Sequence, residues 1–362
     1  MVVEEKLMKR ILFTGYFGAG NFGDDLMLSV FCNNIENENK LYFLKIFPQN
    51  ITVDIPDFVK VIDISMYGSK VQKVIYGLIM TRMHMFFWIG GTIFTEHDGD
   101  GAYSFVKIAK LLKKKYGYLG VGIGQIHSEK RIYRSNYAIQ NANFITFRDK
   151  NSYEIGKRLN HNVFLTQDLA YLYLEKKNIV KEKDQVIISW RELGKQLSLS
   201  EELNLIRILA ISIIKSKLDF LKIKIIPLDD SNDYDKNLIL YKELIDLSDH
   251  AENIEILCDL KADEKFDLIA SSKINIMGRL HGVFVSEVYK RNTLSMSYSL
   301  KMDEFLKDLN KSEDNIYISD LNIETIDKIL QTNNPISDYK IEQNIALAKE
   351  NIFLFNSFVE GV

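Results

Sequence analysis

Short apolar runs alternate with segments of helical periodicity along almost the whole chain, and this alternation constrains the fold more than any other feature. Runs such as FFWIGG and VIISW are nearly continuous in apolar residues, as expected of strands buried on both faces of a sheet. Strands that alternate with helices form parallel sheets covered by helices. The expected strands are 10–15, 41–46, 59–63, 84–89, 117–123, 144–147, 162–166, 185–190, 222–227, 253–257, 273–277 and 293–297.

The number of expected strands exceeds what one doubly wound sheet holds comfortably, and the charged, weakly periodic stretch 175–185 divides them. We therefore predict two Rossmann-like α/β domains that face a central cleft, over 1–175 and 180–335, and a helix within 336–362 that packs back on the first domain. Ligands of such sheets bind beyond the carboxyl ends of the strands, so the cleft is the expected site. Expected helices lie near 24–36, 69–81, 102–114, 130–140, 150–159, 198–217, 234–247, 263–270, 281–289, 322–331 and 338–358.

Composition and local sequence argue against several classes of protein. A formal net charge of −3 over 362 residues gives no reason to expect binding of nucleic acid. Cys32 and Cys258 lack the spacing of a metal site and indicate buried thiols in a reducing compartment. The most apolar stretch, 74–94, contains Arg82, His84 and two glycines, which favour a helix followed by a buried strand over a membrane span. The first ten residues do not resemble a signal peptide, so we expect a cytoplasmic protein.

The stretch ILFTGYFGAGNFGDD, 11–25, is rich in glycine directly after the first strand. Gly18, Gly20 and Gly23 satisfy the pattern G-x-G-x-x-G, but a dinucleotide site also needs a carboxylate at the end of the second strand, which here ends in Phe47-Pro48. The glycines either form a tight turn or let the helix that opens near Asp24 approach a ligand. Asp24 and its neighbour Asp25 either cap that helix or hold a sugar hydroxyl.

Two further strands end in glycines, Gly90-Gly91 and the run that precedes Gln125. Several glycine-rich strand ends suggest a ligand that lies across one edge of a sheet. The loop around Glu96, His97 and Asp100 contains carboxylates, but it lacks the spacing of a helical metal motif, and we predict no metal site.

Cationic side chains follow other strands. Arg148 stands between the strand FITF and a helix, where a guanidinium binds a phosphate or carboxylate unless it pairs with Asp149 or Asp168. Arg191 has the same position after a later strand. Arg279, His281 and Lys301 follow two successive strands of the second domain. They could hold an anion and supply a proton; the alternative is a histidine bonded to backbone beside two solvated cations.

These motifs together resemble those of the polysaccharide pyruvyl transferases. GYFGAGNFGDD corresponds to the family pattern G-Y-x-G-x-x-N-x-G-D-E, and TQDLAY to T-x-D-x-A. GGT, GVGIGQI and ITFRDKNSYEIGKRL also match, and GRLHGVFVSEVYKRNTLSMSYSLKMDEFL resembles the run R-L-H-A…Y-D-x-K. Asp25 stands in place of the usual Glu, Gly282 in place of Ala, and YSLK in place of YDPK.

The resemblance implies a GT-B-like fold and transfer of a pyruvyl group from phosphoenolpyruvate to a sugar, with formation of a ketal and release of phosphate. It implies no metal or nucleotide cofactor. Three cations would bind the donor, and His281 would protonate its methylene carbon while Asp24 accepts a proton from the acceptor. The donor-binding residues are Arg148, Arg279 and Lys301; the acceptor-side residues are Gly18, Gly20, Asn21, Asp25, Gly91 and Gln125.

Two other functions stay open at this point. A GT-B glycosyltransferase would bind a nucleotide sugar, with Asp229 or Asp230 on the ribose, and a non-catalytic protein of a surface-polysaccharide pathway would release no phosphate. The expected acceptor is a nucleotide-linked or lipid-linked sugar or a repeat unit of the polymer. The apolar stretch 351–362 either packs on the first domain or contacts the inner face of a membrane or a second copy of the chain.

Overall fold

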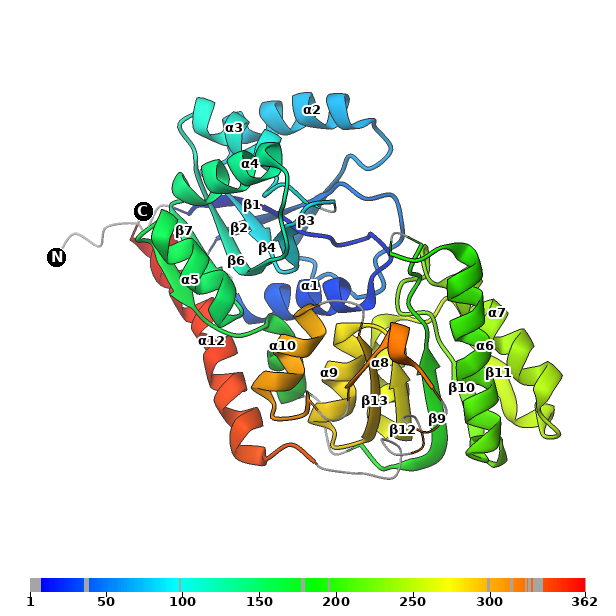
Figure 1. The fold of residues 1–362 in the computed structure, drawn as a ribbon. Coiled ribbons are helices and arrows are strands. Elements are labelled where there is room, and N and C mark those ends of the chain that lie inside the picture. Colours follow the sequence, from blue (N-terminus) through cyan, green and yellow to red (C-terminus); the bar gives the residue numbers. More distant parts are fainter. Residues whose placement is uncertain are drawn as a thin grey trace. The chain divides into compact units, whose positions relative to one another are not determined.

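The computed structural model describes residues 8–35, 39–97, 99–176, 180–194, 196–297, 300–312, 315–322, 324, 327 and 335–361. They form two compact units (Figure 1). The first unit consists of the described residues of Met1–Ala19, Asp24–Lys176 and Gln343–Val362, and the second of those of Gly20–Gly23 and Lys177–Glu342. The four residues Gly20–Gly23 therefore belong to the second unit, although the chain on both sides of them belongs to the first.

The first unit contains a parallel sheet in the order β3-β2-β1-β4-β6-β7-β8, and the short strand β5 pairs with β6. Its central strands are apolar and buried, since helices cover both faces of the sheet. The strands are β1 (Arg10–Thr14), β2 (Lys40–Lys45), β3 (Val59–Asp63), β4 (Met85–Ile89), β5 (Thr92–Phe94), β6 (Lys115–Ile123), β7 (Phe144–Phe147) and β8 (Val163–Leu165).

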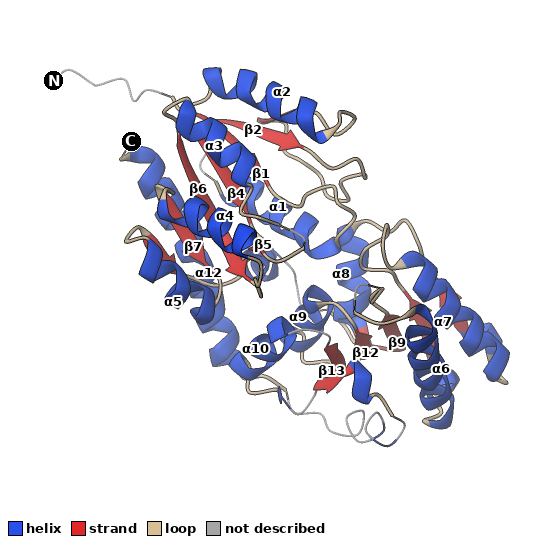
Figure 2. Ribbon diagram, turned by 45° about the horizontal axis from the view of Figure 1, so that its top comes forward, coloured by secondary structure: helices blue, strands red, loops and turns tan. Residues whose placement is uncertain are grey.

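The helices of the first unit divide between the two faces of this sheet (Figure 2). Tyr76 and Val106 are buried in one apolar cluster with Phe86, which places α2 and α3 on one face. Phe31 of α1 packs edge-on against Phe13 on the other face. The helices are α1 (Phe22–Asn34), α2 (Ser69–Arg82), α3 (Tyr103–Leu111), α4 (Glu129–Gln140), α5 (Lys150–Leu159) and the 3-10 helix η1 (Leu169–Lys176).

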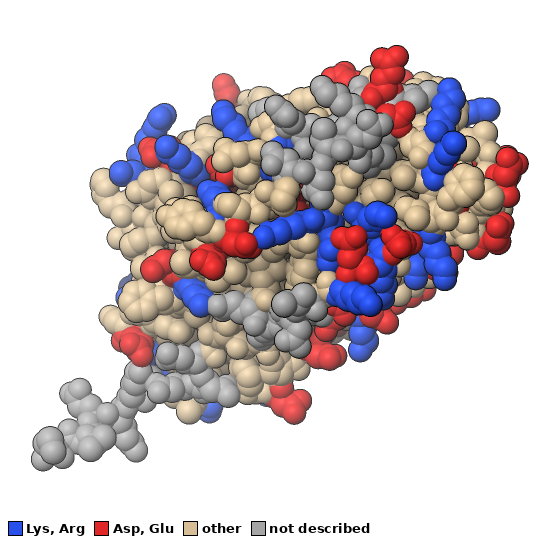
Figure 3. Space-filling model, turned by 90° about the horizontal axis from the view of Figure 1, so that it is seen from below, with Lys and Arg blue, Asp and Glu red and all other residues tan. Residues whose placement is uncertain are grey.

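Acidic and basic side chains are intermixed on the face of the molecule that Figure 3 shows. This mixture agrees with the small formal net charge of −3. Helices α2 and α3 do not have this mixture of charges. Neither helix contains an aspartate or glutamate, and both contain lysine.

The second unit contains a parallel sheet in the order β11-β10-β9-β12-β13-β14. Its strands are β9 (Lys183–Ser189), β10 (Lys222–Ile225), β11 (Ile254–Ile256), β12 (Ser272–Met277), β13 (Asn292–Ser297) and β14 (Asn315–Tyr317). Its helices are α6 (Leu199–Lys215), α7 (Tyr234–Leu247), α8 (Ala262–Ser271), α9 (Leu280–Val288), α10 (Leu300–Asp308) and the 3-10 helices η2 (Leu218–Phe220), η3 (Ala251–Asn253) and η5 (Ile318–Asp320).

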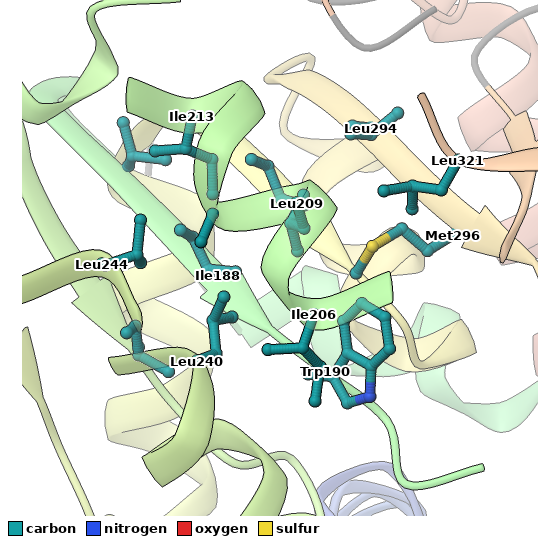
Figure 4. Close-up of a cluster of buried hydrophobic side chains, with 14 of the residues drawn as sticks. Ile188, Trp190, Ile206, Leu209, Ile213, Leu240, Leu244, Leu294, Met296 and Leu321 are labelled. Carbon is teal, nitrogen blue, oxygen red and sulfur yellow. The ribbon is translucent and has the colours of Figure 1, made fainter. Parts of the chain in front are cut away.

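A cluster of buried apolar side chains lies between this sheet and helices α6 and α7 (Figure 4). Trp190, directly after β9, is fully buried in it, and its indole nitrogen donates to the buried Glu202 of α6 at 3.0 Å. Helix α6 starts with a capping box, in which Ser198 and Glu201 satisfy each other's backbone N–H groups. The end of β9 is therefore held both by apolar packing and by hydrogen bonds.

Helix α12 (Asp338–Glu360) begins in the second unit and belongs to the first from Gln343 onward. Its Phe355 packs edge-on against Phe31 of α1 and Phe87 of β4, with ring centroids 5.5 and 4.8 Å apart. Its Asn351 is fully buried: the side-chain oxygen accepts from the hydroxyls of Thr146 and Thr166, and the side-chain nitrogen donates to a carbonyl.

We expect Asn351→Ala to lower the free energy of unfolding by at least about 2 kcal/mol, because it leaves two buried hydroxyls and the carbonyl of Gln167 without these bonds. Urea unfolding followed by circular dichroism measures the change. Asn33→Ala is the matched control, since Asn33 is exposed and bonds only within its own helix in the interactions described. A loss no larger than that of the control would contradict the role assigned to Asn351.

The predicted fold class is confirmed, and each expected strand coincides with an observed one. The short strands β5 and β14 and helix α10 were not predicted. The helix expected at 322–331 lies mostly outside the described residues. Within the described part of the chain, no helix is both long enough and apolar enough to cross a membrane.

Candidate functional site

The segment Gly20–Gly23, at the end of the glycine-rich loop and the start of α1, belongs to the second unit and bonds to it through its backbone. The N–H of Phe22 donates to the carbonyl of Leu228 at 2.9 Å, and the N–H of Asp230 donates to the carbonyl of Gly20 at 3.1 Å. Asn21 forms an isolated antiparallel bridge with Asp229, and its side chain accepts from the N–H of Gly23 at 3.0 Å. Residues 20–22 therefore pair through their backbone with residues 228–230, which follow β10.

Two glycines, Gly20 in the loop and Gly23 in the first turn of α1, are required by the space around them. Gly20 has a φ of +88°, and a Cβ at this position would lie 2.6 Å from the hydroxyl of Ser231. A Cβ at Gly23 would lie 1.8 Å from Nδ1 and 2.1 Å from Cγ of His281. Because no side chain fits there, the α-carbon of Gly23 lies directly against the His281 ring.

His281 stands in the first turn of α9, beyond the carboxyl end of β12. The next residue, Gly282, is also crowded: a Cβ there would lie 2.6 Å from Cδ1 of Leu228 and 2.8 Å from the sulfur of Met277. The glycine at this position, where the resemblance leads one to expect alanine, fits these two neighbours.

Arg279 precedes α9 and is held by two carboxylates. Its Nε and Nη2 donate to the two oxygens of Asp233 at 2.5 and 2.7 Å, and Nη2 lies 3.0 Å from an oxygen of Asp229. Burial raises the pKa of the Asp233 carboxyl, while the hydrogen bonds and charge of Arg279 act in the opposite direction. This two-point contact fixes the plane of the guanidinium.

Asp233 has a second role that the sequence did not reveal. Its Oδ1 also accepts from the N–H of Glu192, in the loop after β9. The buried Asn237 bonds both the N–H and the carbonyl of Trp190, at 2.9 Å each. The backbone on both sides of Arg191 is thus fixed, and Gly278 of the neighbouring strand end lies against it. Asp233 and Asn237 stand at the start of α7, and nothing in the sequence around them indicates that they contact the loop after β9.

Asp229 and Asp230, the two acids considered for a ribose, are engaged in the structure. Asp229 accepts from Ser231 and Asn232 and contacts Arg279. Asp230 forms two bonds of 2.8 Å with the buried Lys265. Burial raises the pKa of the Asp230 carboxyl, and the Lys265 ammonium opposes that shift.

In the first unit, Arg148 follows β7 and is buried. Its guanidinium forms an ion pair with Asp168 and donates to the hydroxyl of Thr92 at 2.9 Å. The sequence left this pairing with Asp168 open as an alternative to binding of an anion. The pair was expected at the surface, but the Arg148 side chain is only 8% exposed. Gly122 of β6 lies beside the same guanidinium, since a Cβ there would be 3.4 Å from Nε of Arg148.

The two adjacent acids after the glycine-rich loop have different surroundings. Asp24 is 8% exposed, and its Oδ1 lies 3.4 Å from where a Cβ of Gly91 would be, at the carboxyl end of β4. Asp25 is fully buried and accepts from the N–H of Gly18 and from the N–H and hydroxyl of Thr52. The contacts of Asp25 stabilise the loop.

The remaining predicted residues lie at strand ends. Gly18 and Gly91 have φ values of +70° and +75°, and Gln125 is exposed after β6. Lys301 lies in the first turn of α10, and its side chain lies outside the described part of the structure. Among the described residues, no group of three or more His, Cys, Asp or Glu side chains is placed to hold a metal ion.

The predicted residues fall into two sets by unit. Arg279, His281, Gly20 and Asn21 belong to the second unit, where His281 contacts Gly23 and Arg279 pairs with Asp229, the bridge partner of Asn21. Arg148, Asp24, Asp25, Gly18, Gly91 and Gln125 belong to the first unit.

Comparison with known proteins gives a family and a fold. The family model described as polysaccharide pyruvyl transferase matches residues 21–299, well over half of the chain. No curated protein sequence matches significantly.

Solved structures resemble this chain over nearly its whole length. The UDP-GlcNAc 2-epimerase of Methanocaldococcus jannaschii has a TM-score of 0.68 at 12% identity, with 97% of this chain and 100% of that chain covered. Anabaena HepE, solved with UDP and glucose, has a TM-score of 0.53 at 11% identity, with 97% and 98% covered. The sucrose-phosphate synthase of Thermosynechococcus elongatus has a TM-score of 0.55 at 8% identity, with 98% of each chain covered. These likenesses show a GT-B fold.

Proposed function

Since the chain belongs to the polysaccharide pyruvyl transferase family, we propose that it transfers the pyruvyl group of phosphoenolpyruvate to a sugar of a surface polysaccharide or of its precursor. The product is a pyruvate ketal, and phosphate is released. The acceptor is a nucleotide-linked or lipid-linked sugar, or a repeat unit of the polymer, and the reaction takes place in the cytoplasm.

The observation that carries the proposal is the contact of Gly23 with His281. These residues lie in the two motifs at opposite ends of the family match. Packing of one motif against the other fixes the histidine at the carboxyl edge of a parallel sheet, where ligands of such folds bind. This arrangement supports a chemical role for His281.

The cations are suited to a small donor that carries two anionic groups. Phosphoenolpyruvate carries a carboxylate and a phosphate, and a guanidinium binds either group through two parallel hydrogen bonds. Arg279 is oriented by the buried carboxylate of Asp233, and Arg148 by the partly buried carboxylate of Asp168. A cation that is already oriented loses less conformational entropy when the donor binds. Lys301, in the first turn of α10, is the third donor-binding residue that we propose.

The proposed reaction has three steps. His281 donates a proton to the methylene carbon, so that C2 becomes an oxocarbenium-like centre. One sugar hydroxyl attacks C2 while Asp24 accepts its proton. The C2–O bond to phosphate then breaks while the proton on Asp24 passes to the leaving phosphate, and the second hydroxyl closes the ketal ring on C2 and returns its proton to His281. The atoms balance as phosphoenolpyruvate plus a diol giving ketal plus phosphate.

The test is calorimetric titration of phosphoenolpyruvate into the wild-type protein and into Arg279→Lys. The lysine keeps a positive charge beside Asp229 and Asp233 but loses the planar two-point geometry. We expect the dissociation constant to rise about 10–100-fold, the range of a lost charge-assisted hydrogen bond. Arg207→Lys is the matched control, because Arg207 lies on α6 with 63% of its side chain exposed.

A second measurement follows phosphate release with a panel of sugar acceptors. Phosphate release that depends on both phosphoenolpyruvate and an acceptor supports the proposal. Binding of a nucleoside diphosphate with no binding of phosphoenolpyruvate, in the presence or absence of acceptors, contradicts it and favours a glycosyltransferase.

A further inference from the structure

Helices α2 and α3 expose apolar side chains on the surface of the first unit. Val71, Val74 and Leu78 of α2 are 48%, 65% and 66% exposed, and Leu111 of α3 is 81% exposed. The spacing of three and four residues places the α2 side chains on one face of that helix. An exposed face of this kind marks an interaction site more often than isolated apolar residues do.

The two helices are neighbours. A Cβ at Gly77 of α2 would lie 3.6 Å from the side chain of Ile108 of α3, and Lys114 donates to the carbonyl of Thr81 at the end of α2. Both ribbon views place α2 and α3 together on the same side of the sheet (Figures 1 and 2). Their exposed side chains therefore form a surface that we call the α2–α3 face, defined by Val71, Val74, Leu78, Leu111, Lys70 and Lys107.

The charges of the α2–α3 face have one sign. Lys70 and Lys107 are exposed, and neither helix contains an acidic residue. The chain as a whole carries a formal net charge of −3, and acidic and basic groups mix on the face shown in Figure 3. The α2–α3 face is thus locally basic, although the chain as a whole has slightly more acidic than basic residues.

We propose that the α2–α3 face binds the surface of a membrane that contains anionic lipids. Aliphatic side chains enter the boundary between headgroups and acyl chains, and lysines beside them contact the anionic headgroups. Lysine also allows its alkyl stem to lie on apolar surface while the ammonium stays in water. Protein interfaces, in contrast, are enriched in aromatic residues and arginine and depleted in lysine, which favours the lipid surface.

This inference goes beyond the proposed function, since it concerns where the protein acts. Enzymes that modify lipid-linked sugars need access to a membrane surface, but the binding of lipid requires neither donor nor acceptor. The two proposals can therefore fail independently.

The test is co-flotation of the full chain with vesicles of phosphatidylglycerol or of phosphatidylcholine alone. We expect the protein to float with the anionic vesicles, to float weakly or not at all with the neutral ones, and to be released as salt is raised. Lys70→Gln and Lys107→Gln should each weaken binding roughly fivefold, from about 1 kcal/mol for each basic residue near an anionic surface.

The apolar part is tested by Val74→Glu/Leu78→Glu, which should weaken binding at least about tenfold through lost apolar contact and added negative charge. Leu199→Glu is the matched control: Leu199 is 61% exposed at the start of α6, in the second unit. Circular dichroism verifies that each variant is folded.

Lack of binding to phosphatidylglycerol vesicles would overturn the proposal. So would equal binding by Val74→Glu/Leu78→Glu and the wild type, or an equal loss in Leu199→Glu. Failure to bind lipid, together with capture of a defined acidic protein that Val74→Glu/Leu78→Glu does not capture, would assign the α2–α3 face to a protein partner instead.

Discussion

Replacing His281 by asparagine is expected to lower the rate of phosphate release from phosphoenolpyruvate by about 10²–10⁴-fold, the usual contribution of a well-placed acid or base. Asparagine occupies part of the volume of the imidazole beside Gly23 and keeps a polar atom there, but it cannot donate a proton near neutral pH. Stopped-flow or coupled phosphate detection at saturating donor and acceptor measures the change in kcat.

Binding separates a chemical role from a structural one. If His281 supplies the proton, calorimetry should give a dissociation constant for phosphoenolpyruvate close to that of the wild type while kcat falls. His161→Asn is the control, because His161 is exposed in the first unit and should leave both quantities unchanged. An unchanged kcat in His281→Asn would show that another group protonates the donor.

Replacing Gly23 by alanine is expected to lower kcat by about 10²-fold, although this residue has no side chain of its own. The added methyl group would lie 1.8 Å from Nδ1 of His281, so either the ring or the start of α1 must move. Displacement of a catalytic group by about 1 Å costs on the order of 10²-fold in rate. Overpacking of this kind also lowers stability by about 1–3 kcal/mol.

Two comparisons make this prediction specific. In Gly77→Ala, a Cβ meets only the side chain of Ile108 at 3.6 Å, an ordinary contact, so activity should be unchanged and stability should rise by about 0.5–1 kcal/mol. If Gly23 acts through His281, then Gly23→Ala/His281→Asn should be no slower than His281→Asn alone. Additive losses in the double variant would show that Gly23 affects the rate by another route.

Much of the fold was predictable from the sequence because a parallel sheet leaves a strong local signal. Strands such as β4 are continuous apolar runs, and the helices between them have their own period. The strands β5 and β14 contain three residues each, but length alone did not hide them, because β8 and β11 are as short and were predicted. Strand β5 follows directly on Gly90-Gly91, which indicate the end of the preceding strand, and β14 follows the polar stretch 307–314. Helix α10 is nine residues long and follows its strand closely, so the sequence did not separate it from a loop.

The candidate site was predictable only in part, for a different reason. Spacing along the chain indicated which residues follow strands, and Arg148, Arg279 and His281 do so. Spacing contains no information about which side chain each one meets. The pairing of Arg279 with Asp233 and the contact of Gly23 with His281 join segments far apart in the sequence, and neither leaves a local pattern.

The assignment of Gly20–Gly23 to the second unit also limits how these proteins can be recombined. A hybrid that joins the first 176 residues of one relative to the following segment of another would pair His281 with a foreign loop. Such a hybrid would contain two intact sheets and yet a mismatched histidine environment. An exchange that keeps the histidine environment must transfer residues 20–23 together with 177–342. The residues that must be exchanged together are therefore discontinuous in the sequence, both in natural recombination and in protein engineering.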